Sequence, residues 1–69
     1  MNFAQAMHQL MLEREMTAKE LADLSGVNAP YVSRLLSGKI KEPTWEKACA
    51  IIDALGVTVD EFKELQESK

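Results

Sequence analysis

The chain has 69 residues, of which 46% are hydrophobic and 28% charged, and its formal net charge is −3. These proportions are typical of one small folded domain and exclude a disordered chain. The longest stretch without a charged residue, residues 1–12, is too short and too polar to cross a bilayer. The start of the chain lacks a signal-peptide pattern, and the single cysteine, Cys49, has no partner for an internal disulfide. We therefore expect a cytoplasmic protein with one domain, residues 1–69, and no membrane segment.

The negative charge is unevenly distributed along the chain. Residues 16–41 carry four basic and two acidic side chains, a net charge of +2, whereas residues 42–69 carry three basic and seven acidic side chains, a net charge of −4. An acidic protein binds nucleic acid poorly overall, but a basic segment can still bind where its cations share one face. The alternative is a chance split on a short chain.

Helical periodicity and capping residues predict five short helices, at about residues 2–14, 17–26, 28–36, 44–55 and from 58 onward. Two of them begin with a capping box, formed by Thr17 with Glu20 and by Thr58 with Glu61. No segment alternates as a strand does, so the expected class is all-α. The side chains expected to face inward are Phe3, Ala6, Met7, Leu10, Met11, Leu21, Ala22, Leu24, Val32, Leu35, Leu36, Trp45, Ala48, Ile51, Ile52, Leu55, Val59, Phe62 and Leu65. For Trp45 a place at the edge of a dimer is the alternative.

The connection between the second and third predicted helices is only three residues long, Gly26-Val27-Asn28. A short connection with glycine between two helices is typical of a helix-turn-helix, whose second helix can enter the major groove of DNA. Ala22 offers a small side chain where the two helices cross, and Gly26 can adopt the positive φ that the turn needs.

Residues 16–62 resemble the phage repressor and Cro type of helix-turn-helix, the XRE family. The shared elements are ELA before the turn, GV within it, SGK after the third helix and ALGVTVDEF near the end, and the resemblance extends over residues 3–65. It implies a lambda-repressor-like bundle of five helices with the helix-turn-helix at about residues 18–37. It also implies a repressor-like transcriptional regulator that binds double-stranded DNA as a dimer on a palindromic site.

The resemblance assigns DNA contacts to particular positions. The base-reading positions, on the outward face of the recognition helix at about residues 28–36, are Ala29, Pro30, Ser33 and Arg34. Arg34 offers the most specific base contact of the four, because its guanidinium can form two hydrogen bonds to one guanine. The alternative is a solvated surface arginine. Contacts to the DNA backbone, through helix-end amides, loop amides and cations, are expected from Thr17, Ala18, Lys19, Tyr31, Ser37, Gly38, Lys39 and Lys41. The alternatives are a partly buried surface tyrosine at Tyr31 and an ordinary solvated loop at Lys39 and Lys41.

Three departures from the family pattern change these expectations. Ala18 stands where the family commonly has a glutamine that contacts phosphate, and Ala29 and Pro30 occupy two reading positions with apolar side chains. The first departure removes that phosphate contact, and the second favours readout of DNA shape or backbone. Met11 and Leu36 stand where many members have an arginine–glutamate pair, which predicts that these two apolar side chains touch.

Few basic contacts make a monomer a weak binder, so we expect a homodimer whose two recognition helices lie about 34 Å apart. The expected interface residues are Ile40, Val57, Val59 and Leu65. The acidic balance and the sparse reading face favour the alternative, a protein-binding adaptor or antitoxin whose partner is a toxin or a phage regulator. His8 is the single histidine, Cys49 has no nearby base, and the carboxylates fall on different helix faces, so we expect no metal, no cofactor and no enzyme activity.

Overall fold

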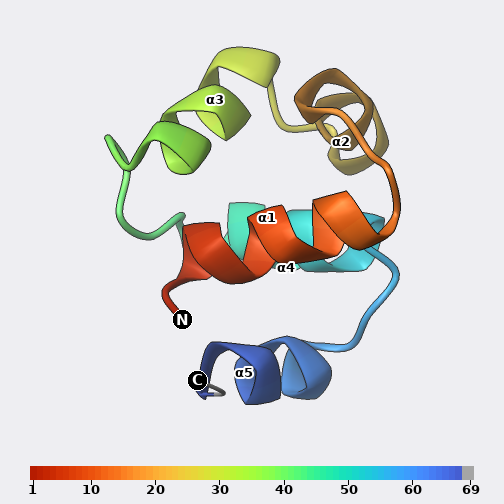
Figure 1. The fold of residues 1–69 in the computed structure, drawn as a ribbon. Coiled ribbons are helices and arrows are strands. Elements are labelled where there is room, and N and C mark those ends of the chain that lie inside the picture. The colour runs from red at the N-terminus through yellow and green to blue at the C-terminus, as the bar shows by residue number, and fades with distance from the viewer. Residues whose placement is uncertain (68–69) are drawn as a thin grey trace.

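The computed structural model describes residues 1–67, and within that range the chain forms five helices and no strand (Figure 1). The helices are α1 (Phe3–Glu13), α2 (Ala18–Ser25), α3 (Ala29–Ser37), α4 (Trp45–Ala54) and α5 (Val59–Glu67). The predictions of an all-α class and of five helices are confirmed, and each predicted boundary lies within one residue of the observed one.

Helices α1 and α4 cross the middle of the molecule, with α2 and α3 on one side and α5 on the other (Figure 1). Helix α2 packs against both α3 and α4, while α5 packs mainly against α1. The first residue lies against the last turn of α5, because the Met1 ammonium donates a hydrogen bond to the Gln66 carbonyl oxygen at 2.6 Å. The pair α2–α3 therefore forms one end of the molecule and leaves its outer side uncovered.

A polar side chain caps the start of every helix. Each cap accepts a hydrogen bond from the amide three residues on, and the caps are Asn2, Thr17, Asn28, Thr44 and Thr58. The two predicted capping boxes are present, and Asn2 forms a third one with Gln5 that was not predicted. A cap contributes about 1 kcal/mol, which matters for helices as short as these.

The capping carboxylates Glu20 and Glu61 make the stability of the fold sensitive to acid. Hydrogen bonds from Thr17 and Thr58, above all from their backbone amides, lower the pKa of each carboxyl below its ordinary value of 4.5. Because the pKa is lowered in the folded state, the stabilisation is complete above pH 4.5 and is lost as the pH falls through the lowered value.

We therefore expect the thermal midpoint of the wild-type protein to drop more steeply below pH 4.5 than that of the double variant Glu20→Gln/Glu61→Gln. Glutamine keeps a side-chain oxygen for the capping bond but does not titrate. Melting followed by circular dichroism across this pH range measures the difference. Parallel pH profiles for the two proteins would contradict the assignment.

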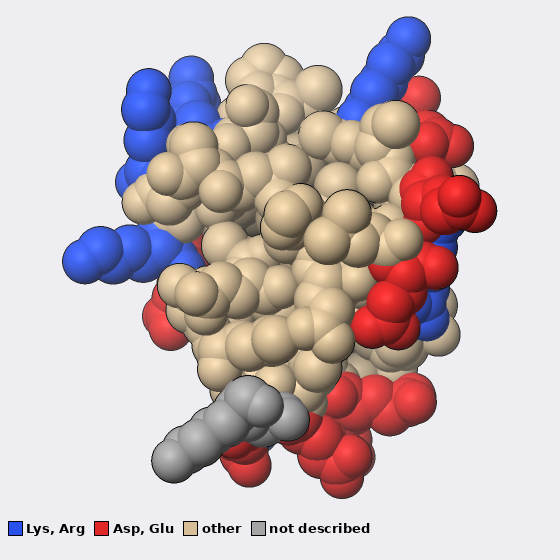
Figure 2. Space-filling model, viewed as in Figure 1, with Lys and Arg blue, Asp and Glu red and all other residues tan. Residues whose placement is uncertain are grey.

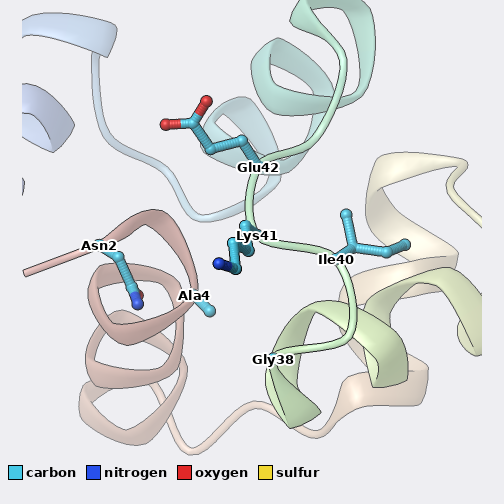
Figure 3. A pocket seen from close by; sticks show the side chains of 6 residues that line it. All are labelled: Asn2, Ala4, Gly38, Ile40, Lys41 and Glu42. Carbon is cyan, nitrogen blue, oxygen red and sulfur yellow. The ribbon is translucent and has the colours of Figure 1, made fainter.

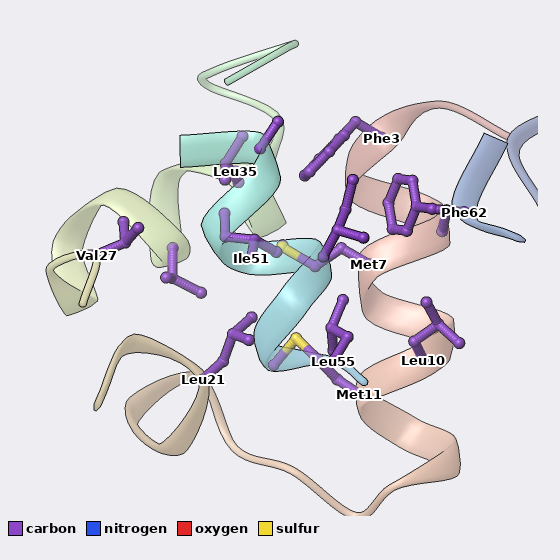
Figure 4. Close-up of a cluster of buried hydrophobic side chains, with 14 of the residues drawn as sticks. Phe3, Met7, Leu10, Met11, Leu21, Val27, Leu35, Ile51, Leu55 and Phe62 are labelled. Carbon is purple, nitrogen blue, oxygen red and sulfur yellow. The ribbon is translucent and has the colours of Figure 1, made fainter. Parts of the chain in front are cut away.

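The buried side chains form one cluster to which every helix contributes (Figure 4). The phenyl rings of Phe3 and Phe62 lie 4.8 Å apart between their centroids and join α1 to α5. Among the residues described, no polar or charged residue is buried. The members of the cluster are Phe3, Ala6, Met7, Leu10, Met11, Leu21, Ala22, Val27, Val32, Leu35, Ala48, Ile51, Ile52, Leu55 and Phe62.

For two residues the prediction of a place in the core is wrong. Leu24 is 65% exposed and Trp45 is 71% exposed. Leu24 lies about 110° around the helix from the centre of the buried stripe of α2, so three-residue spacing from Leu21 takes it past the edge of the core. Trp45 is the first residue of α4 and lies beside the stripe that Ala48, Ile51 and Ile52 bury.

Three other predicted core residues, Leu36, Val59 and Leu65, are only half-buried at the edge of the cluster. Leu36 lies on α3, which packs against α1, the helix that carries the buried Met11. Their side-chain contact stays a prediction. Val27 was not expected in the core and is buried there, because it anchors the turn between α2 and α3.

Candidate nucleic-acid interface

The turn between α2 and α3 has the geometry that the sequence predicted. Gly26 has a φ of 77°, in the left-handed region that favours glycine, and its amide donates to the Ala22 carbonyl oxygen at 2.9 Å. The Ser25 hydroxyl accepts from the Val27 amide at 3.2 Å, and the Val27 side chain enters the core. The turn is therefore held at three consecutive residues, and the orientation of α3 against α2 is fixed.

Helix α3 buries one face and leaves the other exposed. Val32 and Leu35 are fully buried, which docks the helix on the core. The four predicted base-reading residues lie together on the exposed face and are Ala29, Pro30, Ser33 and Arg34. No side chain in residues 1–67 pairs with the Arg34 guanidinium, so all of its donors are available to a ligand.

The start of α2 offers hydrogen-bond donors. The Thr17 hydroxyl accepts from the Glu20 amide at 3.1 Å. The amides of Ala18 and Lys19 have no acceptor within the described part of the chain, as is usual in the first turn of a helix. The Glu20 carboxylate lies at the same helix end, bonded to the Thr17 amide at 3.0 Å, and its negative charge opposes an anion there.

The loop after α3 differs from the prediction in one respect. The amides of Gly38, Lys39 and Ile40 donate to the carbonyl oxygens of Arg34 and Leu35 at the end of α3, at 3.0–3.2 Å. The Ser37 hydroxyl also donates to the Arg34 carbonyl oxygen, at 3.1 Å. These donors close the helix, with Gly38 at a φ of 84°. Of the loop groups predicted to contact DNA, the side chains of Lys39 and Lys41 remain exposed.

The surface charges separate in part. Lys and Arg side chains project at the upper left, near α3 and the loop after it, and at the upper right, near α2 (Figure 2). The surface between them is mostly uncharged. Asp and Glu gather along the right edge and at the bottom around α5. The basic side chains at the upper left thus lie at α3 itself, on the side of the molecule away from α5, whereas the basic side chain near α2 stands beside acidic ones.

A hollow of about 600 Å³ lies where the loop after α3 passes the start of α1 (Figure 3). Its lining residues are Asn2, Ala4, Gly38, Ile40, Lys41 and Glu42. The lining includes one cation and one anion, so the hollow favours neither sign of ligand. Ile40, predicted as an interface residue, is half-buried against the core.

Comparison with known proteins decides the family. A family model described as a helix-turn-helix domain matches residues 2–65, which is nearly the whole chain. The chain belongs to the helix-turn-helix family. The match confirms the resemblance of the sequence to the Cro-like class of helix-turn-helix domains. No curated protein and no solved structure matches the chain.

A helix-turn-helix domain acts on DNA through the helix that follows its turn, which indicates a DNA-binding regulator. In this helix-turn-helix protein that helix is α3, with its exposed face described above. None of the helices described is long and apolar enough to span a membrane. Within residues 1–67 no three His, Cys, Asp or Glu side chains gather as a metal site would require. The expectation of no cofactor stays a prediction.

Proposed function

We propose that residues 1–69 form one sequence-specific transcriptional regulator of the repressor type, with the helix-turn-helix at about residues 18–37 and the recognition helix at about residues 28–36. The observation that carries the proposal is the uncovered outer face of α3, where the Arg34 guanidinium has no protein partner. Such a face fits the major groove, which admits one helix. The protein would act in the cytoplasm with the DNA that it binds and would need no catalytic group.

In this proposal Arg34 reads a guanine, and Ala29, Pro30 and Ser33 contact the base edges around it. Thr17, Ala18 and Lys19 bind phosphate on one flank of the groove through a hydroxyl, two amides and an ammonium. Lys39 and Lys41 bind phosphate on the other flank through their side chains, while Ser37 and Gly38 hold the end of α3. Apolar groups at two reading positions support a share of shape readout.

We also propose a homodimer on a palindromic site. One face of a single small domain makes few phosphate contacts, and two copies about 34 Å apart double them. Ile40, Val57, Val59 and Leu65 are each half-buried, so part of each side chain stays accessible to a second copy. Trp45, 71% exposed, remains a candidate for the edge of the same interface.

The test is binding to duplexes with a randomised core, selected by the protein itself and then compared with random duplex. A regulator enriches one sequence, prefers it to random DNA at physiological salt, and binds with a stoichiometry of two chains per duplex. Binding that is no tighter than to random DNA, even at low salt, would overturn the proposal. The protein-binding adaptor or antitoxin, which the acidic balance and the sparse reading face support, would then become the better assignment.

Removing the charge of Glu20 is expected to tighten DNA binding. The variant Glu20→Gln keeps the capping bonds of α2 but removes the anion that opposes phosphate at that helix end. A unit charge at about 6 Å in a high dielectric changes the binding free energy by about 0.7 kcal/mol, or roughly threefold in affinity.

The chain supplies a matched control for this prediction. Glu61→Gln makes the same change in net charge and in an equivalent capping box, with hydrogen bonds of 3.0 Å, on α5. Fluorescence anisotropy with the selected duplex compares the two variants. Equal affinities for Glu20→Gln and Glu61→Gln would mean that the start of α2 does not face phosphate.

A further inference from the structure

Lys47 lies outside the segments from which the sequence predicted DNA contacts. It belongs to the first turn of α4, and its Nζ lies 5.0 Å from the centroid of the Tyr31 ring in the first turn of α3. An ammonium within about 6 Å of an aromatic centroid is attracted by the ring. Both side chains are half-buried, so the contact joins α4 to the recognition helix at the surface.

Tyr31 connects this contact to the exposed face of α3. It precedes Arg34 by three residues, and side chains at that spacing are neighbours on a helix surface. Arg34, Tyr31 and Lys47 therefore follow one another from the reading face of α3 to α4. The Tyr31 hydroxyl and the Lys47 ammonium have no hydrogen-bond acceptor and no carboxylate partner among the residues described.

The nearest acid in the sequence does not neutralise Lys47. Glu46 is exposed and lies about 100° around α4 from Lys47, and no ion pair joins the two. The ring of Tyr31 attracts the ammonium without supplying an acceptor for its three donors. A phenol donor and an ammonium are thus held side by side, and the group they lack is an oxygen anion.

We propose that Tyr31 and Lys47 form a phosphate-binding pair of the DNA interface, on the flank of α3 that carries Arg34. The inference rests on the proposed function and adds to it a contact from α4. The cation–π contact holds both donors in place before DNA binds, so less conformational freedom is lost on binding. The phosphate would accept one hydrogen bond from the Tyr31 hydroxyl and one from the Lys47 ammonium.

The salt dependence of binding tests the pair, because each phosphate contact by a cation contributes about 0.9 to the slope of log K against log salt. Lys47→Met keeps the apolar stem and is expected to reduce the slope by about 0.9. The factor by which Lys47→Met weakens binding is then about eightfold larger at 0.1 M salt than at 1 M salt. Lys47→Arg keeps the charge and is expected to retain the wild-type slope. Lys63→Met on α5 removes an equal charge from the far side of the molecule and serves as the matched control.

Tyr31→Phe tests the contribution of the hydroxyl separately from that of the ring. It keeps the cation–π partner and is expected to weaken binding about tenfold, the loss of one hydrogen bond to a charged group, with an unchanged salt slope. The measurements use the duplex selected by the wild-type protein, with circular dichroism to verify folding.

The outcomes distinguish this inference from the proposed function. A slope for Lys47→Met equal to that for Lys63→Met, with a lower thermal midpoint, would show that Lys47 only packs α4 against α3 and would overturn the inference alone. A Tyr31→Phe variant that binds as tightly as wild type would also overturn it. A wild-type protein that binds no duplex would overturn both proposals.

Discussion

Arg34→Ala is expected to weaken binding to the selected duplex by roughly 5- to 150-fold, because one bidentate arginine–guanine contact is worth about 1–3 kcal/mol of discrimination. Arg34 lies on the exposed face of α3, and its guanidinium has no partner in the part of the chain that is described. The other reading positions offer two apolar side chains and one hydroxyl, so no neighbour replaces the lost contact. Fluorescence anisotropy with the selected and the random duplex measures the change.

The comparison between the two duplexes identifies the kind of contact. A base contact makes Arg34→Ala lose affinity for the selected duplex and very little for random DNA. An equal loss on both would assign Arg34 to phosphate. Lys63→Ala, which removes a cation from α5 on the side away from α3, is the control for net charge. An Arg34→Ala variant no weaker than this control would remove the main support for the proposed function.

Phe62→Ala is expected to cost about 3–5 kcal/mol of unfolding free energy, the usual range for truncating a buried phenylalanine. Phe62 is 1% exposed and is the one buried residue within the described span of α5. Its ring packs on that of Phe3 at 4.8 Å and so holds α5 against α1. A domain of this length has a total stability of about 3–10 kcal/mol, so the variant is expected to be largely unfolded or to release α5.

Urea unfolding followed by circular dichroism measures this loss. Val59→Ala is the matched control, because Val59 is a half-buried residue of the same helix and its truncation is expected to cost much less. A loss for Phe62→Ala no larger than that for Val59→Ala would mean that α5 is held by its other contacts. The substitution could also release α5 while the rest of the domain stays folded. Phe62→Ala would then weaken the proposed dimer, to which α5 contributes, more than it lowers the stability of α2 and α3.

Much of the fold could be predicted because its signals are local. Thr17 with Glu20 and Thr58 with Glu61 form the predicted capping boxes, and Gly26 adopts the positive φ that ends α2. Each of these interactions spans at most four residues, so neighbouring residue types determine it. The Asn2–Gln5 box has the same spacing and could have been found in the same way.

The two errors in the core have different causes. Leu24 lies about 110° from the centre of the buried stripe of α2, so the periodicity of its own helix already directs it away from the core. Trp45 lies about 20° around α4 from the buried Ile52, yet it is exposed, because the neighbouring helices cover only part of the surface of α4. Periodicity gives the direction of a side chain around its own helix. It carries no information on how far the adjacent helix extends.

In the candidate interface, too, some features follow from local sequence and others from packing between helices. The amino-acid order alone determined the five helices, the three-residue turn and the outward positions of Ala29, Pro30, Ser33 and Arg34, since all of these follow from contacts within a few residues. The amides after α3 bond to its last carbonyl oxygens within six residues, so Gly38 could have predicted that closure in the same way as Gly26. Only the tertiary structure decided that Lys47 of α4 lies over the ring of Tyr31. The reason is physical: side chains from different helices meet only when the shared burial of the core brings the helices together, and no spacing along the chain encodes that distance.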